Sequence, residues 1–382
     1  MDKQISVGVV GAGTMGIGIA QLAAEAGHRV MVCDSRAEAL DKALAGLRAT
    51  LDKSVAKGKR EQAAADALMG RINTTGQLED LAPCGLVVEA IVEDLRVKQE
   101  VFKRLDAALA KDAVLASNTS SLSVTAIAAA CTVPERVIGL HFFNPAPLMP
   151  LVEVVPGLAT DAALPAHCTG LMKAWGKSPV VCKDTPGFIV NRVARPFYGE
   201  SLRLFEEGAA SMAQIDAALR GAGFRMGPFE LMDLIGNDIN FAVTRSVWEA
   251  FFYDPRYKPS LTQQRHVESG RLGRKSGRGY YPYGEAQATE QAPLPPNADA
   301  IVERVLALLI NEAVDALFLG VASREDLDLA MTKGVNYPKG LLAWAEEKGP
   351  AHWLAVLEKL QAEYGEDRYR PSPLLRRMAR GR

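Results

Sequence analysis

The stretch Val7-Gly-Val-Val-Gly-Ala-Gly-Thr-Met-Gly16 consists of a short apolar run followed directly by the pattern G-x-G-x-x-G. In a strand–turn–helix unit, the first glycine permits the tight turn and the second lets the backbone approach a pyrophosphate. The third allows the helix to pack closely on the strand. The first turn of that helix would present free N–H groups to phosphates. We therefore predict the following cofactor-binding residues: Gly11, Gly13, Thr14, Met15 and Gly16.

A second apolar run, Arg29–Cys33, ends in the acid Asp34. A carboxylate at this position can hold both ribose hydroxyls of NAD, and it would repel the additional phosphate of NADP. Arg36 is the counter-argument, because a nearby arginine can pair with that phosphate. Asp34 could also cap the helix that begins near residue 36. We predict NAD as the cofactor and Asp34 as its ribose ligand.

Strand-like and helix-like segments alternate over residues 3–140, which is typical of a parallel sheet covered by helices on both faces. The helical stretch over 36–69 is too long for one crossover and indicates an inserted helix pair. One helix at 161–175 and one strand at Pro179–Cys182 follow. We predict a Rossmann-type doubly wound α/β sheet, with strands at Ile5–Val10, Arg29–Cys33, Leu86–Ile91, Val114–Ala116 and Val137–Leu140.

From Thr185 onward the pattern is helical, with helices expected at 188–207, 211–220, 228–253 and 260–269. Residues 283–297 have the polar, alanine-rich and proline-rich composition of a linker. A final helical unit over about 299–365 repeats the second region, since Glu200 matches Glu312 at a difference of 112 and further pairs keep that difference. We predict an all-α domain that is duplicated, with domains at 1–184, 185–283 and 299–382 and a linker at 284–298.

The formal net charge of −1 gives no broad basic field, which argues against a nucleic-acid partner. No apolar run reaches the roughly 20 residues needed to cross a bilayer, so we expect no membrane partner. The five cysteines include no C-x-x-C pair, which indicates neither zinc nor a disulfide framework, and a reduced cytoplasmic protein fits best. The basic C-terminal end is expected to be a solvated tail, with arginines at Arg376, Arg377, Arg380 and Arg382.

The stretch GLHFFNPAPLMPLVE at 139–153 places a histidine twelve residues before a glutamate, across two proline-rich turns. This layout could bring the imidazole of His141 and the carboxylate of Glu153 together. A base beside a nicotinamide site is the minimum equipment for oxidising an alcohol. His141 could instead be a core histidine, and Glu153 a surface carboxylate on an edge strand.

Two further strand ends carry polar residues: Glu89-Ala-Ile-Val-Glu93 and Ser117-Asn-Thr-Ser-Ser121. Lys98 follows on the helix after the first of them. Since ligands bind at the carboxyl edge of such sheets, these segments indicate a lined cofactor cleft. The alternative is that they only cap helices.

In these motifs the chain resembles the L-3-hydroxyacyl-CoA dehydrogenases. The matching segments are GAGTMG (11–16), EAIVED (89–94), SNTSSL (117–122), GLHFFNP (139–145), LVEVV (151–155), KDTPGFIVNR (183–192) and MGPFELMDLIG (226–236). The duplicated tail and the segment VARPFYGESLR (193–203) resemble the longer bacterial members that act on 3-hydroxyadipyl-CoA in phenylacetate breakdown.

The resemblance implies roles for individual residues. His141 would be the general base for the C3 hydroxyl, and Glu153 would orient its ring. Ser120 would bind the reacting oxygen, and Asn191 would hold the substrate near its thioester. Asn144 would add a polar contact behind the His–Glu pair, and we group it with the cofactor-binding residues. It further implies that NAD is contacted by Ala90, Glu93, Lys98 and Asn118. Taken singly, Ser120 could be a helix cap and Asn191 a solvent-facing residue.

The resemblance thus implies an NAD-dependent oxidation of (S)-3-hydroxyacyl-CoA, with 3-hydroxyadipyl or 3-hydroxybutyryl thioesters as candidates. The competing hypotheses are a non-catalytic, crystallin-like NAD-binding protein and a dehydrogenase of free hydroxy acids. A terminal carboxylate on the acyl chain could pair with Arg192 or Arg195, between which the sequence does not select. The second copy lacks TPGFIVNR and could take the place of a partner subunit in a homodimer formed through the helical domains. The CoA phosphates could meet the basic residues Lys53, Lys57, Lys59 and Arg60, which could equally be a solvated charge run.

Overall fold

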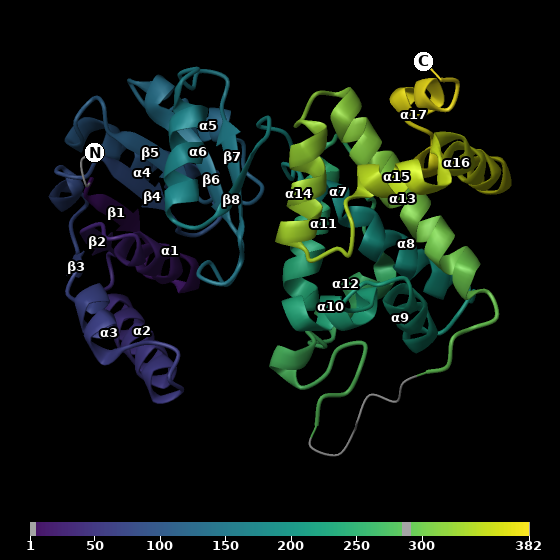
Figure 1. Ribbon diagram of the computed structural model, residues 1–382, viewed down its shortest axis with the longest axis horizontal. Helices are drawn as coiled ribbons and strands as arrows, with labels where there is room; N and C mark the ends of the chain where they lie inside the picture. The colour runs from purple at the N-terminus through teal and green to yellow at the C-terminus, as the bar shows by residue number, and fades with distance from the viewer. Residues whose placement is uncertain (1–4, 285–291, 382) are drawn as a thin grey trace. The chain divides into compact units, whose positions relative to one another are not determined.

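A computed structural model describes residues 5–284 and 292–381 of this chain. The chain separates into two compact units, Met1–Thr185 and Pro186–Arg382 (Figure 1). Most of the predicted linker, residues 285–291, lies outside the described residues, as does Arg382. Within the described ranges, no helix combines the length and the apolar character needed to cross a bilayer.

The first unit is built on a sheet whose described strands follow the order β3-β2-β1-β4-β5-β6-β7-β8. All neighbours are parallel except β6 and β7, which pair antiparallel, so β7 and β8 run against the other six strands. The chain order reverses between β1 and β4, as a doubly wound sheet requires. The strand bounds are β1 Val7–Val10, β2 Val30–Cys33, β3 Ile72–Thr75, β4 Leu86–Glu89, β5 Val114–Ser117, β6 Val137–Phe142, β7 Leu151–Pro156 and β8 Ser178–Val181.

The helices of this unit bury apolar faces against the sheet, and one core cluster joins Ile19 and Ala23 of the first helix to Val7 and Val9 of β1. The predicted insertion is a pair of helices, α2 and α3, which pack side by side (Figure 1). The helix bounds are α1 Thr14–Glu25, α2 Ala37–Ala56, α3 Gln62–Met69, α4 Leu95–Ala108, α5 Val124–Ala128 and α6 Leu164–Ala174, with 3₁₀ turns η1 Leu78–Leu81 and η2 Pro134–Arg136.

Strand β7 was expected only in the alternative that placed Glu153 on an edge strand, and strand β3 was not predicted at all. Its four residues, INTT, include only one buried side chain, Ile72, so the segment lacks the apolar run by which the other strands of the sheet are recognised. It forms an edge strand by parallel pairing with β2, and that pairing supplies its backbone hydrogen bonds.

The second unit is helical throughout. Two helices expected to be continuous are broken: the segment 188–207 forms α7 and α8, and 228–253 forms α10 and α11, separated at Gly236, whose φ is +102°. The bounds are α7 Val190–Val193, α8 Arg195–Glu206, α9 Met212–Gly221, α10 Pro228–Ile235, α11 Asn237–Ala250, α12 Leu261–Glu268, α13 Ala298–Phe318, α14 Arg324–Gly334, α15 Leu341–Lys348, α16 Pro350–Tyr364 and α17 Pro373–Met378, with 3₁₀ turns η3 Pro255–Tyr257, η4 Arg274–Ser276 and η5 Asp367–Tyr369.

The expectation of a frayed tail is wrong for the described C-terminal residues, although Arg377 and Arg380 are exposed to solvent. Helix α17 packs on α13 and α16, which extends the second copy beyond residue 365. Arg376 donates to Glu358 at 2.5 Å, and the Arg377 guanidinium lies 5.2 Å from the centre of the Phe318 ring. Cation–π and apolar contacts of this kind hold an arginine-rich segment against the protein.

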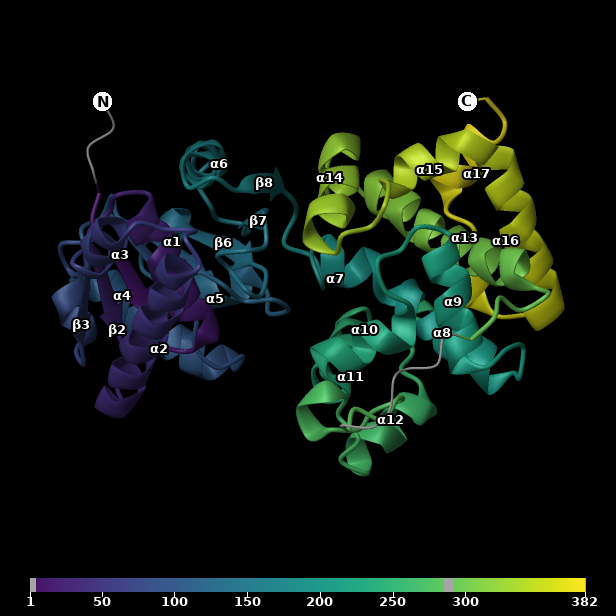
Figure 2. The same ribbon diagram turned by 60° about the horizontal axis from the view of Figure 1, so that its bottom comes forward.

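Helices α8 to α12 of the second unit recur in order as α13 to α17, and η3 recurs as η5. Asp216 accepts backbone N–H groups at the start of α10, and Asp328 does the same at the start of α15. Gly236 and Gly349 both break the chain with positive φ before the next helix. The two copies pack together through α8 and α13 (Figure 2).

The interface between the copies consists of reciprocal ion pairs. Arg192 Nε donates to Glu312 at 2.6 Å, and Arg304 Nε, at the matching position of the other copy, donates to Glu200 at 2.5 Å. Each carboxylate also accepts a hydrogen bond from a tyrosine hydroxyl: Tyr257 donates to Glu312 at 2.5 Å, and Tyr369 donates to Glu200 at 2.8 Å. Contacts that exchange partners in this way are the signature of a two-fold interface, formed here within one chain.

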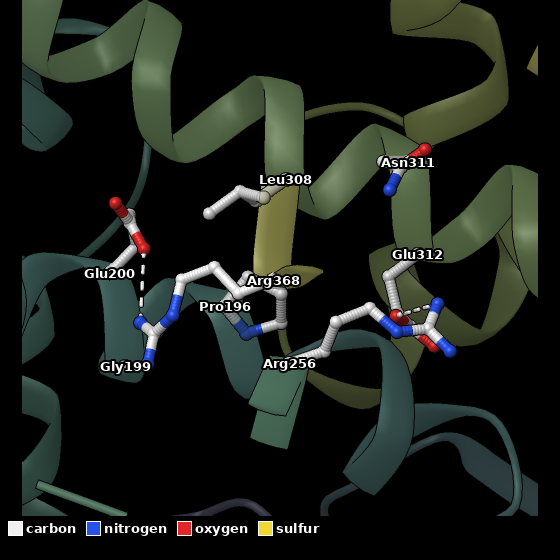
Figure 3. A pocket seen from close by; sticks show the side chains of 8 residues that line it. All are labelled: Pro196, Gly199, Glu200, Arg256, Leu308, Asn311, Glu312 and Arg368. Atoms are coloured by element: carbon white, nitrogen blue, oxygen red, sulfur yellow. Dashed lines mark hydrogen bonds and ion pairs between the residues drawn. The ribbon is translucent and has the colours of Figure 1, made fainter. Parts of the chain in front are cut away.

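A small cavity of about 20 Å³ lies at this interface (Figure 3). Its eight lining residues form four matched pairs, so it lies on the pseudo-two-fold axis of the duplicated unit. They are Pro196 with Leu308, Gly199 with Asn311, Glu200 with Glu312, and Arg256 with Arg368. A polar space of this size fits about one water molecule, which makes the cavity part of the packing.

We predict that Glu312→Ala destabilises the helical unit by about 3–5 kcal/mol, because the buried Arg192 guanidinium loses one of its two carboxylate partners and the Tyr257 hydroxyl loses its acceptor. Urea unfolding followed by tryptophan fluorescence measures the change. Glu325→Ala, at an exposed acid on α14, is the matched control and should shift stability by less than about 0.5 kcal/mol. Unfolding of Glu312→Ala at the wild-type urea concentration would contradict the assigned role of the ion pair.

Candidate active site

The three glycines after β1 occupy the positions that their predicted roles require. Gly11 has a φ of +102°, and a Cβ there would lie 2.6 Å from the carbonyl oxygen of Ala90. A Cβ on Gly16 would lie 1.8 Å from the Gly11 carbonyl oxygen, so only glycine lets α1 pack this closely on the turn. A Cβ on Gly13 would meet nothing within 4 Å. The turn is therefore open at Gly13, where a phosphate could reach the N-terminus of α1.

Asp34 follows β2 and is joined to the glycine turn. One carboxylate oxygen accepts the Ala12 N–H at 2.9 Å, and the other accepts the Arg36 N–H at 3.0 Å. The cap of α2 is Arg36, without a side-chain hydrogen bond, so the alternative role of Asp34 as the helix cap is wrong. A partly buried acid next to the first helical turn fits the ribose of NAD.

A buried acid–lysine pair lies at the ends of β4 and α4. Glu89 accepts the Lys98 ammonium at 2.7 Å and the Ser117 hydroxyl at 2.7 Å, and both charged side chains are almost fully buried. Lys98 also lies 3.3 Å from Glu93. This pair fixes the ends of β4 and β5 relative to each other, because each buried charge has its partner.

Glu93 organises the loop after β5. Its carboxylate accepts the Thr119 hydroxyl at 2.7 Å and the Ser120 and Ser121 N–H groups at 2.9 and 3.1 Å. Burial opposes ionisation, but the charge of Lys98 and these hydrogen bonds hold the pKa of Glu93 below its usual range. The loop carrying Ser120 is thus fixed by a carboxylate rather than by a helix.

The proposed helix-cap role of Ser120 is wrong, because Ser123 is the cap of α5 and accepts the Ala126 N–H. Ser123 and the first turn of α5 are in turn bound by Asp184, which accepts the Val124 and Thr125 N–H groups at 3.0 and 2.7 Å. Ser120 therefore lies in a loop that two carboxylates hold in place.

His141 and Glu153 face each other across the antiparallel pair β6–β7, as directly opposed residues of the register. His141 Nδ1 lies 2.6 Å from Glu153 Oε2, and the exposed fractions of the two residues are 6% and 0%. Strand β8 pairs with β7 on its outer side, so the alternative of a surface glutamate on an edge strand is wrong. The imidazole and the carboxylate form a buried dyad.

The two asparagines differ in setting. Asn118 follows β5, and its side-chain oxygen accepts the Phe142 N–H at 2.8 Å, which ties the ends of β5 and β6 together. Asn144 is exposed in the loop after β6. Met15 packs partly buried against the core, and Thr14 begins α1.

Asn191 lies in the second unit, half-buried in α7. The turn before it depends on Gly187, whose φ is +73° and where a Cβ would lie 2.9 Å from the Arg192 nitrogen. The first unit therefore gathers every predicted site residue except Asn191. Glu89 and Ser117 belong to the segments expected to line the cofactor cleft, but their buried contacts were not predicted, although an acid at a strand end with a lysine nine residues later signals such a pair.

A groove of about 980 Å³ begins at the glycine turn and runs along α1 and α2 to the loop at Pro147 and Leu148. Of the four basic residues predicted to meet CoA, Arg60 lines it and donates to Glu25 at 2.5 Å, whereas the three lysines are exposed and are absent from its described lining. Arg36 and Lys42 also line it. Among the described residues, no group of three His, Cys, Asp or Glu side chains is arranged to hold a metal.

Comparison with known proteins defines the class. Residues 6–185 match the family model "3-hydroxyacyl-CoA dehydrogenase, NAD binding domain", and residues 187–283 and 301–382 match "3-hydroxyacyl-CoA dehydrogenase, C-terminal domain". The chain belongs to the 3-hydroxyacyl-CoA dehydrogenase family. Its first unit accordingly carries an NAD-binding domain, and the C-terminal domain model matches both helical copies.

Individual relatives agree with this assignment. The chain is 42% identical to the 3-hydroxyadipyl-CoA dehydrogenase of Escherichia coli K12, over 98% of this chain and 97% of that protein. It is 43% identical to the human mitochondrial hydroxyacyl-coenzyme A dehydrogenase, over 72% of this chain and 90% of that protein. A crystal structure of 3-hydroxybutyryl-CoA dehydrogenase from Escherichia coli K12 superposes with a TM-score of 0.94 at 41% identity, covering 99% of this chain and 98% of that one.

We predict that Asp34→Ser lowers kcat/KM for NAD by about 10–100-fold, because the ribose loses its hydrogen bonds to a charged group. The loss of kcat/KM for NADP should be smaller. Initial rates with each cofactor give the change in preference. Asp41→Ser, at an exposed acid on α2, is the matched control and should leave the preference unchanged. An unaltered NAD preference in Asp34→Ser would show that this carboxylate does not bind the ribose.

Proposed function

We propose that this chain oxidises (S)-3-hydroxyacyl-CoA to 3-oxoacyl-CoA with NAD, with His141 as the general base. The observation that carries the proposal is the buried hydrogen bond between His141 and Glu153, 2.6 Å long, in a unit that also carries the NAD-binding turn. A buried imidazole on a carboxylate is the arrangement that a proton-transferring histidine needs.

Glu153 sets the tautomer of the base. An ionised carboxylate only accepts hydrogen bonds, so Nδ1 must carry the proton that it donates to Glu153. In the neutral ring, Nε2 then bears the lone pair that can take the C3 hydroxyl proton. The negative charge of Glu153 also stabilises the imidazolium that forms, so Glu153 acts on the ring as an orienting partner.

The remaining roles follow from the same chemistry. Bound NAD supplies the hydride acceptor for C3. Ser120 would hydrogen-bond the reacting oxygen from the loop that Glu93 holds, and Asn191 would bind near the thioester. The contacts of Glu93, Lys98, Asn118 and Ala90 at the strand ends support their assignment to the cofactor side, with Asn144 in the adjoining loop.

For the substrate, we propose a short-chain 3-hydroxyacyl-CoA. The support is the similarity to relatives named for 3-hydroxyadipyl-CoA and 3-hydroxybutyryl-CoA. The basic lining of the groove beside the glycine turn, Arg36, Lys42 and Arg60, is suited to phosphates of the nucleotide moieties. The cytoplasmic location, the homodimer and the domain boundaries stay predictions.

The competing hypotheses are disfavoured. A crystallin-like structural protein has no need of a buried imidazole–carboxylate pair, since replacing such a pair by apolar residues is often neutral or stabilising. A dehydrogenase of free hydroxy acids would not be expected to match both domain models of this CoA-dependent family over most of the chain.

We predict that His141→Ala lowers kcat with acetoacetyl-CoA and NADH by about 10²–10⁴-fold, the range of general acid–base catalysis. Glu153→Gln should lower it by a smaller factor, because the ring keeps a hydrogen bond but loses the charge that stabilises the imidazolium. The absorbance of NADH measures the rate in both directions.

His167→Ala, at an exposed histidine on α6, is the matched control and should keep wild-type turnover. NADH binding, followed by fluorescence, should survive in all three variants, which separates loss of chemistry from loss of fold. Near wild-type turnover in His141→Ala would remove the base from the mechanism.

A further inference from the structure

Arg195 is a buried cation that forms no ion pair with an acid among the described residues. Its exposed fraction is 7%, and its one hydrogen bond to a side chain in the described structure runs from an Nη atom to the Thr244 hydroxyl at 3.1 Å. Its guanidinium lies 4.9 Å from the centre of the Tyr198 ring, and its Nε is buried without a hydrogen-bond partner. Burial lowers the pKa of Arg195, and the nearby phenols of Tyr198 and Tyr337 oppose that effect.

The other fully buried arginines of the described chain are all neutralised. Arg136 is paired with Asp106, and Arg192 with Glu312 and Asp315. Arg304 and Arg368 both lie on Glu200. Burying a charge without a counter-charge is costly. Since the other buried arginines have acidic partners, the missing partner of Arg195 indicates that its guanidinium serves a ligand.

The duplication provides an internal comparison. At the position of Arg195, 112 residues later, the second copy has Ala307, and at that of Tyr198 it has Ile310. Aligning α11 and α16 on Gly236 and Gly349, Thr244 corresponds to Leu357. All three replacements are apolar residues with exposed fractions of 0%. The fold therefore does not need a polar cluster here, and the cluster occurs in the copy that carries TPGFIVNR and Asn191.

The second copy nevertheless contributes to this cluster. Tyr337, in the segment between α14 and α15, is buried, and its hydroxyl has no hydrogen-bond partner. Its ring lies 5.7 Å from that of Phe197, which lies 5.6 Å from the ring of Tyr198, the ring beneath the Arg195 guanidinium. Among the described residues, the Arg195 Nε–H and the Tyr337 hydroxyl both lack a hydrogen-bond partner, and the rings of Phe197 and Tyr198 connect the two. Buried donors of this kind can be satisfied by an anion.

We propose that Arg195, with Thr244 and Tyr337, binds a carboxylate at the far end of the acyl chain, so that the substrate is a 3-hydroxyacyl-CoA ending in a carboxylate. This inference rests on the proposed function and selects Arg195 over Arg192. Arg195 begins α8, and Asn191 lies in the preceding α7, so the two residues are four positions apart on consecutive helices of the same copy. A planar carboxylate matches the two-pronged donor of a guanidinium.

The test compares two thioesters of equal chain length, 3-hydroxyadipyl-CoA and 3-hydroxyhexanoyl-CoA, in the full-length enzyme with NAD. We expect wild type to prefer the adipyl substrate, and Arg195→Met to lose about 100-fold in kcat/KM for it, the loss typical when one partner of a buried charge pair is removed. The same variant should keep or improve its kcat/KM for the hexanoyl substrate. Its melting temperature should not fall, because it removes an unpaired buried charge.

Arg245→Met, at the exposed residue that follows Thr244, is the matched control and should leave the ratio unchanged. Equal loss for both substrates in Arg195→Met, or no preference in wild type, would overturn the proposal while leaving the dehydrogenase function standing. Wild type inactive on both thioesters would refute the proposed function and this inference with it. If Arg195→Met does not fold, Arg195→Lys provides the test. Its preference for the adipyl over the hexanoyl thioester should fall about tenfold, because lysine lacks the two-pronged donor of a guanidinium. An unchanged preference would overturn the proposal.

Discussion

The arrangement of the first unit depends on the antiparallel pairing of β7 with β6. That pairing reverses the direction of the sheet and sets His141 opposite Glu153, both buried and 2.6 Å apart. A shift of the register by one residue would turn one of the two side chains to the other face of the sheet. The chemistry that we propose is therefore fixed by backbone hydrogen bonds, and the Glu153 carboxylate is fully buried.

The strand ends around this dyad are held by charges rather than by apolar packing. Glu89 and Lys98 are buried together, and Glu93 binds the loop that carries Ser120. Each of these carboxylates accepts several donors, and a hydrogen-bonded network of this kind holds its members to one geometry. The loop that carries Ser120 is therefore held in position by hydrogen bonds to Glu93, although it is not part of a helix.

The two copies of the helical unit pack on each other inside one chain. Arg192 and Glu312 in one direction, and Arg304 and Glu200 in the other, form a two-fold interface inside a single chain. At the position that matches Arg195, the second copy has a buried apolar residue, Ala307. The difference between the copies is what distinguishes an arginine that builds the fold, Arg192, from one that is available to a ligand, Arg195.

Sequence alone determined the features that depend on neighbouring residues: the glycine turn, the acid after β2, the alternation of strands and helices, and the repeat at a constant spacing. It did not predict β3, which forms by pairing with β2, or the break at Gly236. It placed His141 and Glu153 twelve residues apart, but only the sheet register decided that they touch and are buried. Likewise Arg192 and Arg195 were equivalent candidates in the sequence, since the acids that neutralise Arg192 lie 120 and 123 residues away. Contacts between distant segments are set by packing of the whole chain, so only the tertiary structure could separate the two arginines.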